Sequence, residues 1–164
     1  MIPSSQEFRS LVRRENTQHH HFEIYLLGGF LEEVFLHGVT LQLRQMEYRV
    51  FNDWKTKKDE LSIQKAAHLR ICMQHCQCLC LATDLSPDIS QEIIWQLGFM
   101  DGQKGKPGII PILKEPGVRR QTPDLLSLFP QIYPEQTLGR TTLEVELDTG
   151  QKCRFNQWLT EQNT

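Results

Sequence analysis

The chain has 164 residues, a net charge of −2 at pH 7, 39% hydrophobic residues and 23% charged residues, as expected for one globular domain. This balance gives no reason to expect binding to nucleic acid or to an anionic membrane. No apolar run approaches the ~20 residues that span a bilayer, and the N-terminus lacks the apolar core of a secretion signal. We therefore expect a cytoplasmic protein.

The first part of the chain predicts a small extension ahead of the main domain. Residues 1–21 are expected to form a helical extension and linker, and residues 22–164 the domain itself. Ser4 and Glu7 have the spacing of a capping box, which predicts that a short helix begins there. The histidines at 19–21 are interpreted as a polar surface tract, with a metal site as the weaker alternative.

Short apolar runs and amphipathic stretches then alternate along the chain. Apolar runs typical of buried strands lie at 22–29, 48–54, 78–83 and 108–113. Stretches with helical spacing lie between them, at 31–41, 63–76 and 86–102. Strands that are apolar on both faces and alternate with helices predict an α/β fold, with a central parallel sheet covered by helices on both sides. The remaining sequence predicts a short helix at 123–129, a hairpin turning at 149–150 and a closing helix at 155–162.

Four of the five cysteines are close together, and we interpret them as reduced core residues. Cys72, Cys76, Cys78 and Cys80 match no standard zinc spacing and are too close along one segment for a disulfide framework. Cys78 and Cys80 alternate on one face of a predicted strand, where a thiol acts as a small apolar side chain. No metal site is expected.

A ligand site in a parallel sheet is expected at the carboxyl ends of the strands. In this chain those ends are Leu27–Gly29, Asn52–Trp54, Thr83–Asp84 and Leu113. The two glycines after the first apolar run would let a ligand approach the backbone closely. They do not form a G-x-G-x-x-G fingerprint, and the chain has neither a P-loop nor a G-x-S-x-G elbow.

The predicted helix at 86–102 carries the most informative pattern. Its core face is expected to consist of Ile89, Ile93, Leu97 and Met100. Glu92 and Gln96 lie on another face, one turn apart, and their simplest interpretation is a solvated stripe. Trp95 is more typical of a packing residue than of a ligand platform.

Four motifs in order resemble those of Toll/interleukin receptor (TIR) domains. They are the D-W pair Asp53–Trp54, the segment Leu69–Cys76, the segment Trp95–Gly102 and the segment Gly105–Ile112. The combination is most similar to the stand-alone bacterial TIR proteins of Thoeris anti-phage defence. The resemblance covers about residues 22–113 and implies a flavodoxin-like TIR fold.

The resemblance also implies an activity. TIR enzymes cleave the nicotinamide–ribose bond of NAD⁺ to make ADP-ribose-type immune signals, so NAD⁺ is a substrate and no cofactor is expected. The predicted partners are NAD⁺ or an ADP-ribose-type nucleotide, further copies of the chain through TIR–TIR contacts, and a downstream defence effector. The loop Lys55–Glu60 would gate the site or contact a neighbouring subunit. The resemblance puts nucleotide contacts at Leu27, Gly28, Gly29, Trp54, Thr83 and Trp95.

The chain departs from the TIR pattern at the catalytic position. Gln96 stands where the family has its catalytic glutamate, so the resemblance to NAD⁺ glycohydrolases and cyclases comes with little expected activity as written. Glu92 stands where many TIR domains have a tryptophan, and Leu26–Gly29 replaces a more polar strand end. The amide fits an engineered inactive variant or a natural pseudoenzyme, unless Glu92 supplies the carboxylate from the adjacent turn.

Two alternatives to a catalytic TIR protein follow from the same sequence. The first is a non-catalytic TIR scaffold that acts through protein contacts made by the Lys55–Glu60 loop. The second is a relative of the nucleoside deoxyribosyltransferases, which share the parallel-sheet design and a helix glutamate. The amide at position 96 is equally unfavourable for that second chemistry.

Overall fold

The computed structural model describes residues 4, 6, 7, 10, 21–29, 33–53, 61–112 and 121–161. Trp54, the Lys55–Glu60 loop and Leu113 lie outside these residues, as do two of the three linker histidines. At the N-terminus, the Ser4 backbone N–H donates to the Glu7 carboxylate at 2.8 Å and Glu7 N–H donates to Ser4 Oγ at 3.4 Å. This reciprocal pair confirms the predicted capping box.

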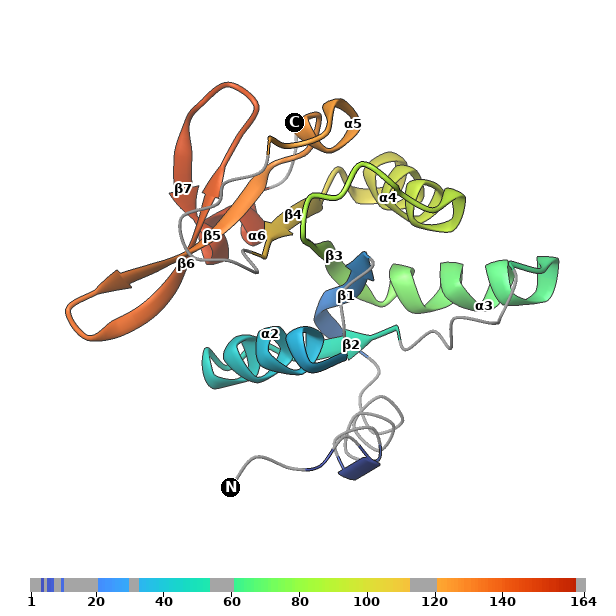
Figure 1. Ribbon diagram of the computed structural model, residues 1–164, viewed down its shortest axis with the longest axis horizontal. Coiled ribbons are helices and arrows are strands. Elements are labelled where there is room, and N and C mark those ends of the chain that lie inside the picture. Colours follow the sequence, from blue (N-terminus) through green and yellow to red (C-terminus); the bar gives the residue numbers. More distant parts are fainter. Residues whose placement is uncertain are drawn as a thin grey trace.

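The described elements follow the predicted alternation of strands and helices (Figure 1). The first half contains β1 (Phe22–Gly29), α2 (Glu33–Gln45), β2 (Val50–Asn52), α3 (Ile63–Gln74), β3 (Cys76–Thr83), α4 (Gln91–Lys104) and β4 (Pro107–Pro111). The second half contains α5 (Asp124–Ser127), β5 (Gln131–Thr137), β6 (Arg140–Glu146), β7 (Lys152–Arg154) and α6 (Phe155–Thr160).

All seven described strands form one sheet, in the order β2-β1-β3-β4-β5-β6-β7. The first five strands run parallel, and β6 and β7 add antiparallel pairs. The α/β prediction is confirmed, with β3 at the centre of the parallel part. The predicted 149–150 hairpin is the β6–β7 pair, but it extends the main sheet instead of standing beside it.

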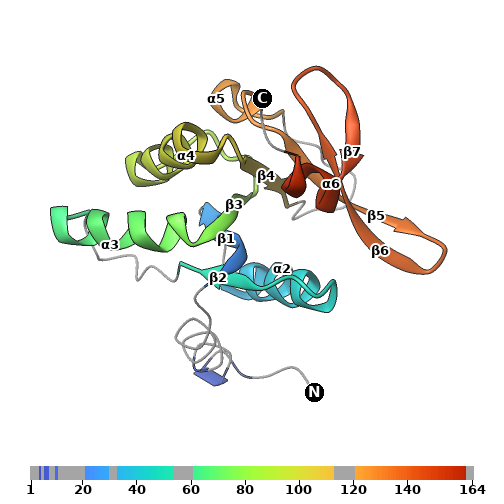
Figure 2. The same cartoon turned by 180° about the vertical axis from the view of Figure 1, so that it is seen from behind.

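Strand β5 has no counterpart in the prediction. Its sequence, QIYPEQT, is mostly polar, contains Pro134, and has only Ile132 fully buried. The strand forms because it pairs with β6 across the tight turn at Leu138–Gly139, where both residues have positive φ. The resulting hairpin projects from the rest of the molecule (Figure 2).

Helices cover both faces of the sheet with separate hydrophobic cores. On one face, α3, α4 and α5 pack on alternate strand residues that include Leu27, Leu79, Leu81 and Ile109. On the other face, α2 and α6 pack on the intervening residues, such as Ile24, Leu26, Cys78, Cys80 and Ile110. Within the described ranges, no helix combines the length and apolar character needed to cross a membrane.

The cysteines are free thiols, and three of them are buried. Cys78 and Cys80 are fully buried on the α2 side, with their sulfurs 3.9 Å apart. Burial raises the pKa of Cys76 to about 12, which keeps this thiol protonated and unreactive. Across the part of the chain that the structure describes, no three His, Cys, Asp or Glu side chains are grouped so as to hold a metal ion.

Helix α2 ends in a Schellman motif with an unusual residue at its left-handed position. Tyr48 N–H donates to the Leu43 carbonyl at 3.1 Å, and Glu47 N–H donates to the Arg44 carbonyl at 2.8 Å. Glu47 has φ of 70°, a conformation that strongly favours glycine because a Cβ atom is crowded there. Position 47 therefore carries an acid in a backbone conformation that glycine would adopt with less strain.

Substituting Glu47→Gly is expected to raise the free energy of unfolding by roughly 0.5–1 kcal/mol, because it relieves the left-handed strain. Urea unfolding followed by circular dichroism measures the change. The matched control is Glu47→Ala, which removes the carboxylate but retains Cβ and should give no such gain. Equal stabilisation by both variants would show that the charge, and not the backbone conformation, is unfavourable.

Candidate functional site

The carboxyl ends of β1, β3 and β4 lie level at one edge of the sheet. Gly29 pairs with Thr83, and Thr83 pairs with Pro111. Asn52, the last residue of β2, is paired in register with Leu26 of β1. This is the edge at which the ligand site is predicted, because parallel sheets bind ligands at the carboxyl ends of their strands.

The turn after β3 is fixed by its own side chains. Thr83 Oγ1 accepts from Leu85 N–H at 3.2 Å, and Asp84 Oδ1 accepts from Ser86 N–H at 3.0 Å. Leu85 has φ of 62° while its side chain is buried in the α3–α4 core. Ser90 then caps α4 by accepting from Ile93 N–H at 3.2 Å. These bonds fix the start of α4 relative to the end of β3.

Gly28 leaves room for the packing of a helix, which differs from the role expected for it. A Cβ atom on Gly28 would lie 2.5 Å from Leu36 Cδ1, so α2 approaches β1 through the space that the glycine leaves. The close approach predicted for a ligand is thus made by the protein's own helix. Leu27, by contrast, is 2% exposed and faces the α3–α4 core.

A buried tyrosine holds the aspartate of the D-W motif, and the sequence prediction missed it. Tyr25, in the middle of β1, donates from its hydroxyl to Asp53 Oδ2 at 2.9 Å. The pKa of Tyr25 is raised mainly by burial and, to a smaller extent, by the adjacent Asp53 charge. The hydroxyl therefore stays protonated and remains a donor. A tyrosine in an otherwise aliphatic strand was the available indication, since a buried phenol requires a partner.

The end of β2 is also tied to α2. The side chains of Thr40 and Asn52 lie 2.9 Å apart in the core, and the Thr40 hydroxyl donates to the Leu36 carbonyl at 2.7 Å. Asn52 and Asp53 are thus both held by neighbouring elements immediately before the chain reaches Trp54. The carboxyl end of β2 is therefore fixed by polar contacts to β1 and α2.

Gln96 is the most unusual side chain of α4. It is completely buried, and neither its amide nitrogen nor its amide oxygen has a hydrogen-bond partner among the described residues. The interpretation of Gln96 as part of a solvated stripe is wrong, because α4 turns this residue toward the sheet beside the core residues Ile93, Leu97 and Met100. An unsatisfied buried amide costs about 1–3 kcal/mol per group.

The other polar positions of α4 contact α3. The Glu92 carboxylate lies 3.7 Å from Lys65 Nζ, which forms an ion pair across the two helices. Trp95 lies under the Arg70 guanidinium at 5.2 Å and beside the Phe99 ring at 6.1 Å. Trp95 and Glu92 therefore take part in helix–helix packing, while Gln96 is enclosed between α4 and the sheet.

The structure brings part of the predicted site together. Leu27 and Gln96 belong to the α3–α4 side of the sheet, and Gly29 and Thr83 end adjacent strands at its carboxyl edge. Gly28 contacts α2, and Trp54 lies outside the described residues. The arrangement offers a buried amide that can both donate and accept, next to the edge at which parallel sheets bind ligands.

Comparison with known proteins gives one informative relative. The chain is 29% identical over 147 residues to a protein of Bacillus cereus (strain MSX-D12) named as a probable 3' cyclic ADP-D-ribose synthase, ThsB'. The aligned region covers 84% of this chain and 75% of the relative. No established family profile matches the chain.

Proposed function

We propose that this chain, a Thoeris-type TIR protein by its similarity to ThsB', binds NAD⁺ at the carboxyl edge of the sheet and contributes to anti-phage signalling. The relative is named for the synthesis of a cyclic ADP-ribose, a product built from NAD⁺ by loss of nicotinamide. In this chain the site has an amide where the family has its catalytic glutamate. We therefore propose an NAD⁺ site with little cleavage activity.

The observation that carries the proposal is the buried amide of Gln96, which has no hydrogen-bond partner among the residues that the structure describes. Native folds rarely leave both polar atoms of one amide unsatisfied, and exceptions mark sites where stability is given up for function. Two neighbouring ribose hydroxyls can satisfy both atoms, because one can donate to the amide oxygen while the other accepts from the amide N–H. Gln96 is thus suited to hold a sugar even without charge.

The same residue explains why cleavage should be slow. Breaking a glycosidic bond develops positive charge on the ribose, and a carboxylate beside it stabilises that charge. A neutral amide offers a dipole but neither a full negative charge nor a base. Glu92, one turn away, is held by Lys65 at the α3–α4 contact, which leaves it poorly suited to replace the missing acid.

Binding of NAD⁺ by Gln96 is tested with the variant Gln96→Leu. Loss of the amide is expected to weaken NAD⁺ binding by about three- to tenfold, since hydrogen bonding worth about 0.7–1.4 kcal/mol in total disappears. The same variant should be more stable than the parent, because an apolar side chain of similar size removes two unsatisfied groups. Saturation-transfer NMR measures the affinity, and urea unfolding measures the stability.

The matched control is Gln91→Leu, five residues earlier at an exposed position of α4, which should change neither quantity. Unchanged NAD⁺ affinity in Gln96→Leu, together with increased stability, would place the nucleotide elsewhere and contradict the proposed site. Absence of NAD⁺ binding by every variant would favour the scaffold alternative. That alternative is supported by the exposed apolar side chains of Ile63 and Ile71 on α3, which are 89% and 55% exposed.

A further inference from the structure

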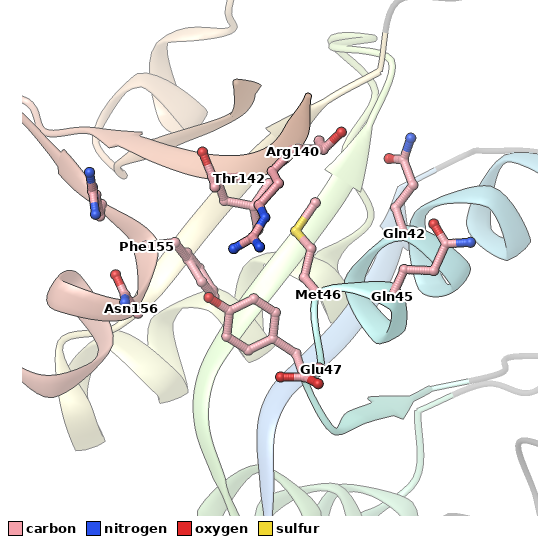
Figure 3. A pocket seen from close by; sticks show the side chains of 12 residues that line it. Gln42, Gln45, Met46, Glu47, Arg140, Thr142, Phe155 and Asn156 are labelled. Atoms are coloured by element: carbon pink, nitrogen blue, oxygen red, sulfur yellow. The ribbon is translucent and has the colours of Figure 1, made fainter. Parts of the chain in front are cut away.

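A pocket lies on the opposite face of the sheet from Gln96. It has a volume of about 630 Å³ and lies between the C-terminal end of α2, strand β6 and the start of α6 (Figure 3). Its apolar wall contains Met46, Tyr48 and Phe155, which belong to the α2–α6 core, whereas Ile93 and Leu97 of α4 belong to the α3–α4 core. The sheet therefore separates this pocket from the proposed NAD⁺ site.

Two guanidinium groups line the pocket without being neutralised. Arg140 begins β6 and Arg154 ends β7, and both side chains are exposed. Neither arginine forms an ion pair within the part of the chain that the structure describes, although Lys152 of β7 pairs with Glu144 at 3.2 Å. Figure 3 shows the Arg140 side chain reaching toward Met46 and Phe155, into the space between the elements. A pair of free guanidinium groups is suited to bind phosphate oxygens.

The remaining lining provides groups that suit a nucleoside. The Tyr48 ring is half-buried and meets the Phe155 ring edge-on at 5.2 Å, which fixes an aromatic surface in the wall. The amides of Gln42, Gln45 and Asn156 also line the pocket, and each can donate and accept toward the edge of a base.

Glu47 adds the one carboxylate in the lining, and it is held in the left-handed conformation that favours glycine. A carboxylate repels phosphate but accepts hydrogen bonds from ribose hydroxyls, as acidic residues do in dinucleotide sites. An acid at a strained position, in a pocket that two arginines and an aromatic ring also line, fits a ligand that is anionic at one end and rich in hydroxyl donors at the other.

We propose that this pocket binds a phosphorylated nucleoside, with Arg140 and Arg154 on the phosphates, Glu47 on the ribose and Tyr48 beside the base. The volume lies within the range of about 300–1,000 Å³ that is usual for small-molecule sites. This site is independent of NAD⁺ cleavage, because it shares no residue with the carboxyl edge of the sheet.

The experiment is calorimetric titration of the whole chain with ADP and, separately, with inorganic pyrophosphate. Arg140→Ala and Arg154→Ala are each expected to weaken ADP binding at least about tenfold, since each removes a charge-assisted contact. Glu47→Gln should weaken ADP binding and leave pyrophosphate binding unchanged or tighter. The matched control is Lys152→Ala, which removes one positive charge from β7 outside the pocket and should change ADP affinity less than about twofold.

Two further results separate this proposal from the NAD⁺ site. Gln96→Leu should leave ADP binding through the arginines unchanged. Loss of ADP binding in that variant would show that ADP binds at the proposed NAD⁺ site instead. Binding of ADP that survives both arginine substitutions, or no binding of ADP at millimolar concentration, would overturn the proposal. Pyrophosphate binding as tight as ADP binding and insensitive to Glu47→Gln would overturn the nucleoside assignment.

Discussion

Replacing Gln96 with glutamate is expected to raise the rate of NAD⁺ cleavage by at least about a hundredfold, the lower end of what general acid–base catalysis contributes. The substitution changes one terminal group and keeps the length of the side chain, so the position of the reacting group on α4 is preserved. The new carboxylate would stabilise the positive charge that develops on the ribose as nicotinamide leaves.

Release of nicotinamide, followed by proton NMR over a wide range of protein concentrations, measures this effect. Gln96→Leu is the control for a change at the same position without charge, and it should be no faster than the parent. Glu92→Gln in the parent chain tests the adjacent acid, and loss of a residual activity in that variant would assign the carboxylate to Glu92. If the glutamate variant leaves NAD⁺ intact at every concentration, the cleavage proposal fails and the scaffold alternative is favoured.

The sequence predicted the parallel half of the sheet because each of its strands has a local pattern. FEIYLLGG and CLCLAT are mostly apolar runs, and their burial on both faces confirms the prediction of buried strands. Strand β5 could not be predicted in this way, because QIYPEQT has neither alternation nor β-branched enrichment beyond Ile132. Its structure depends on pairing with β6, which is a contact between segments and not a property of either one.

The site was predicted less completely than the fold, for a related reason. Helical spacing separates Gln96 from Ile93, Leu97 and Met100 only by the angle around the helix, and an amide at the border of the apolar face is normally solvated. Whether it is buried depends on how closely α4 packs on the sheet beside α3. The packing role of Gly28 similarly depends on Leu36, which the sequence places on a different element.

Placing an acid at position 96 should also make the stability of the fold depend on pH. The side chain of Gln96 has no exposed surface and no partner among the described residues, so burial would raise the pKa of the new carboxyl above its unfolded value of about 4.3. A carboxyl whose pKa is raised by folding favours the folded state most at low pH. That contribution is lost as pH rises from the unfolded pKa to the folded pKa.

Relative to the parent, Gln96→Glu is therefore expected to lose a few kcal/mol of unfolding free energy between pH 5 and pH 8, the scale of an unpaired buried charge. Urea unfolding at both pH values measures the change, with Gln96→Leu as a control whose difference from the parent should not vary with pH. A stability difference that does not change with pH would show that the new carboxylate is paired with a cation or exposed to solvent in the folded state. Saturating NAD⁺ should restore part of the lost stability at pH 8, because binding to the folded state alone stabilises it.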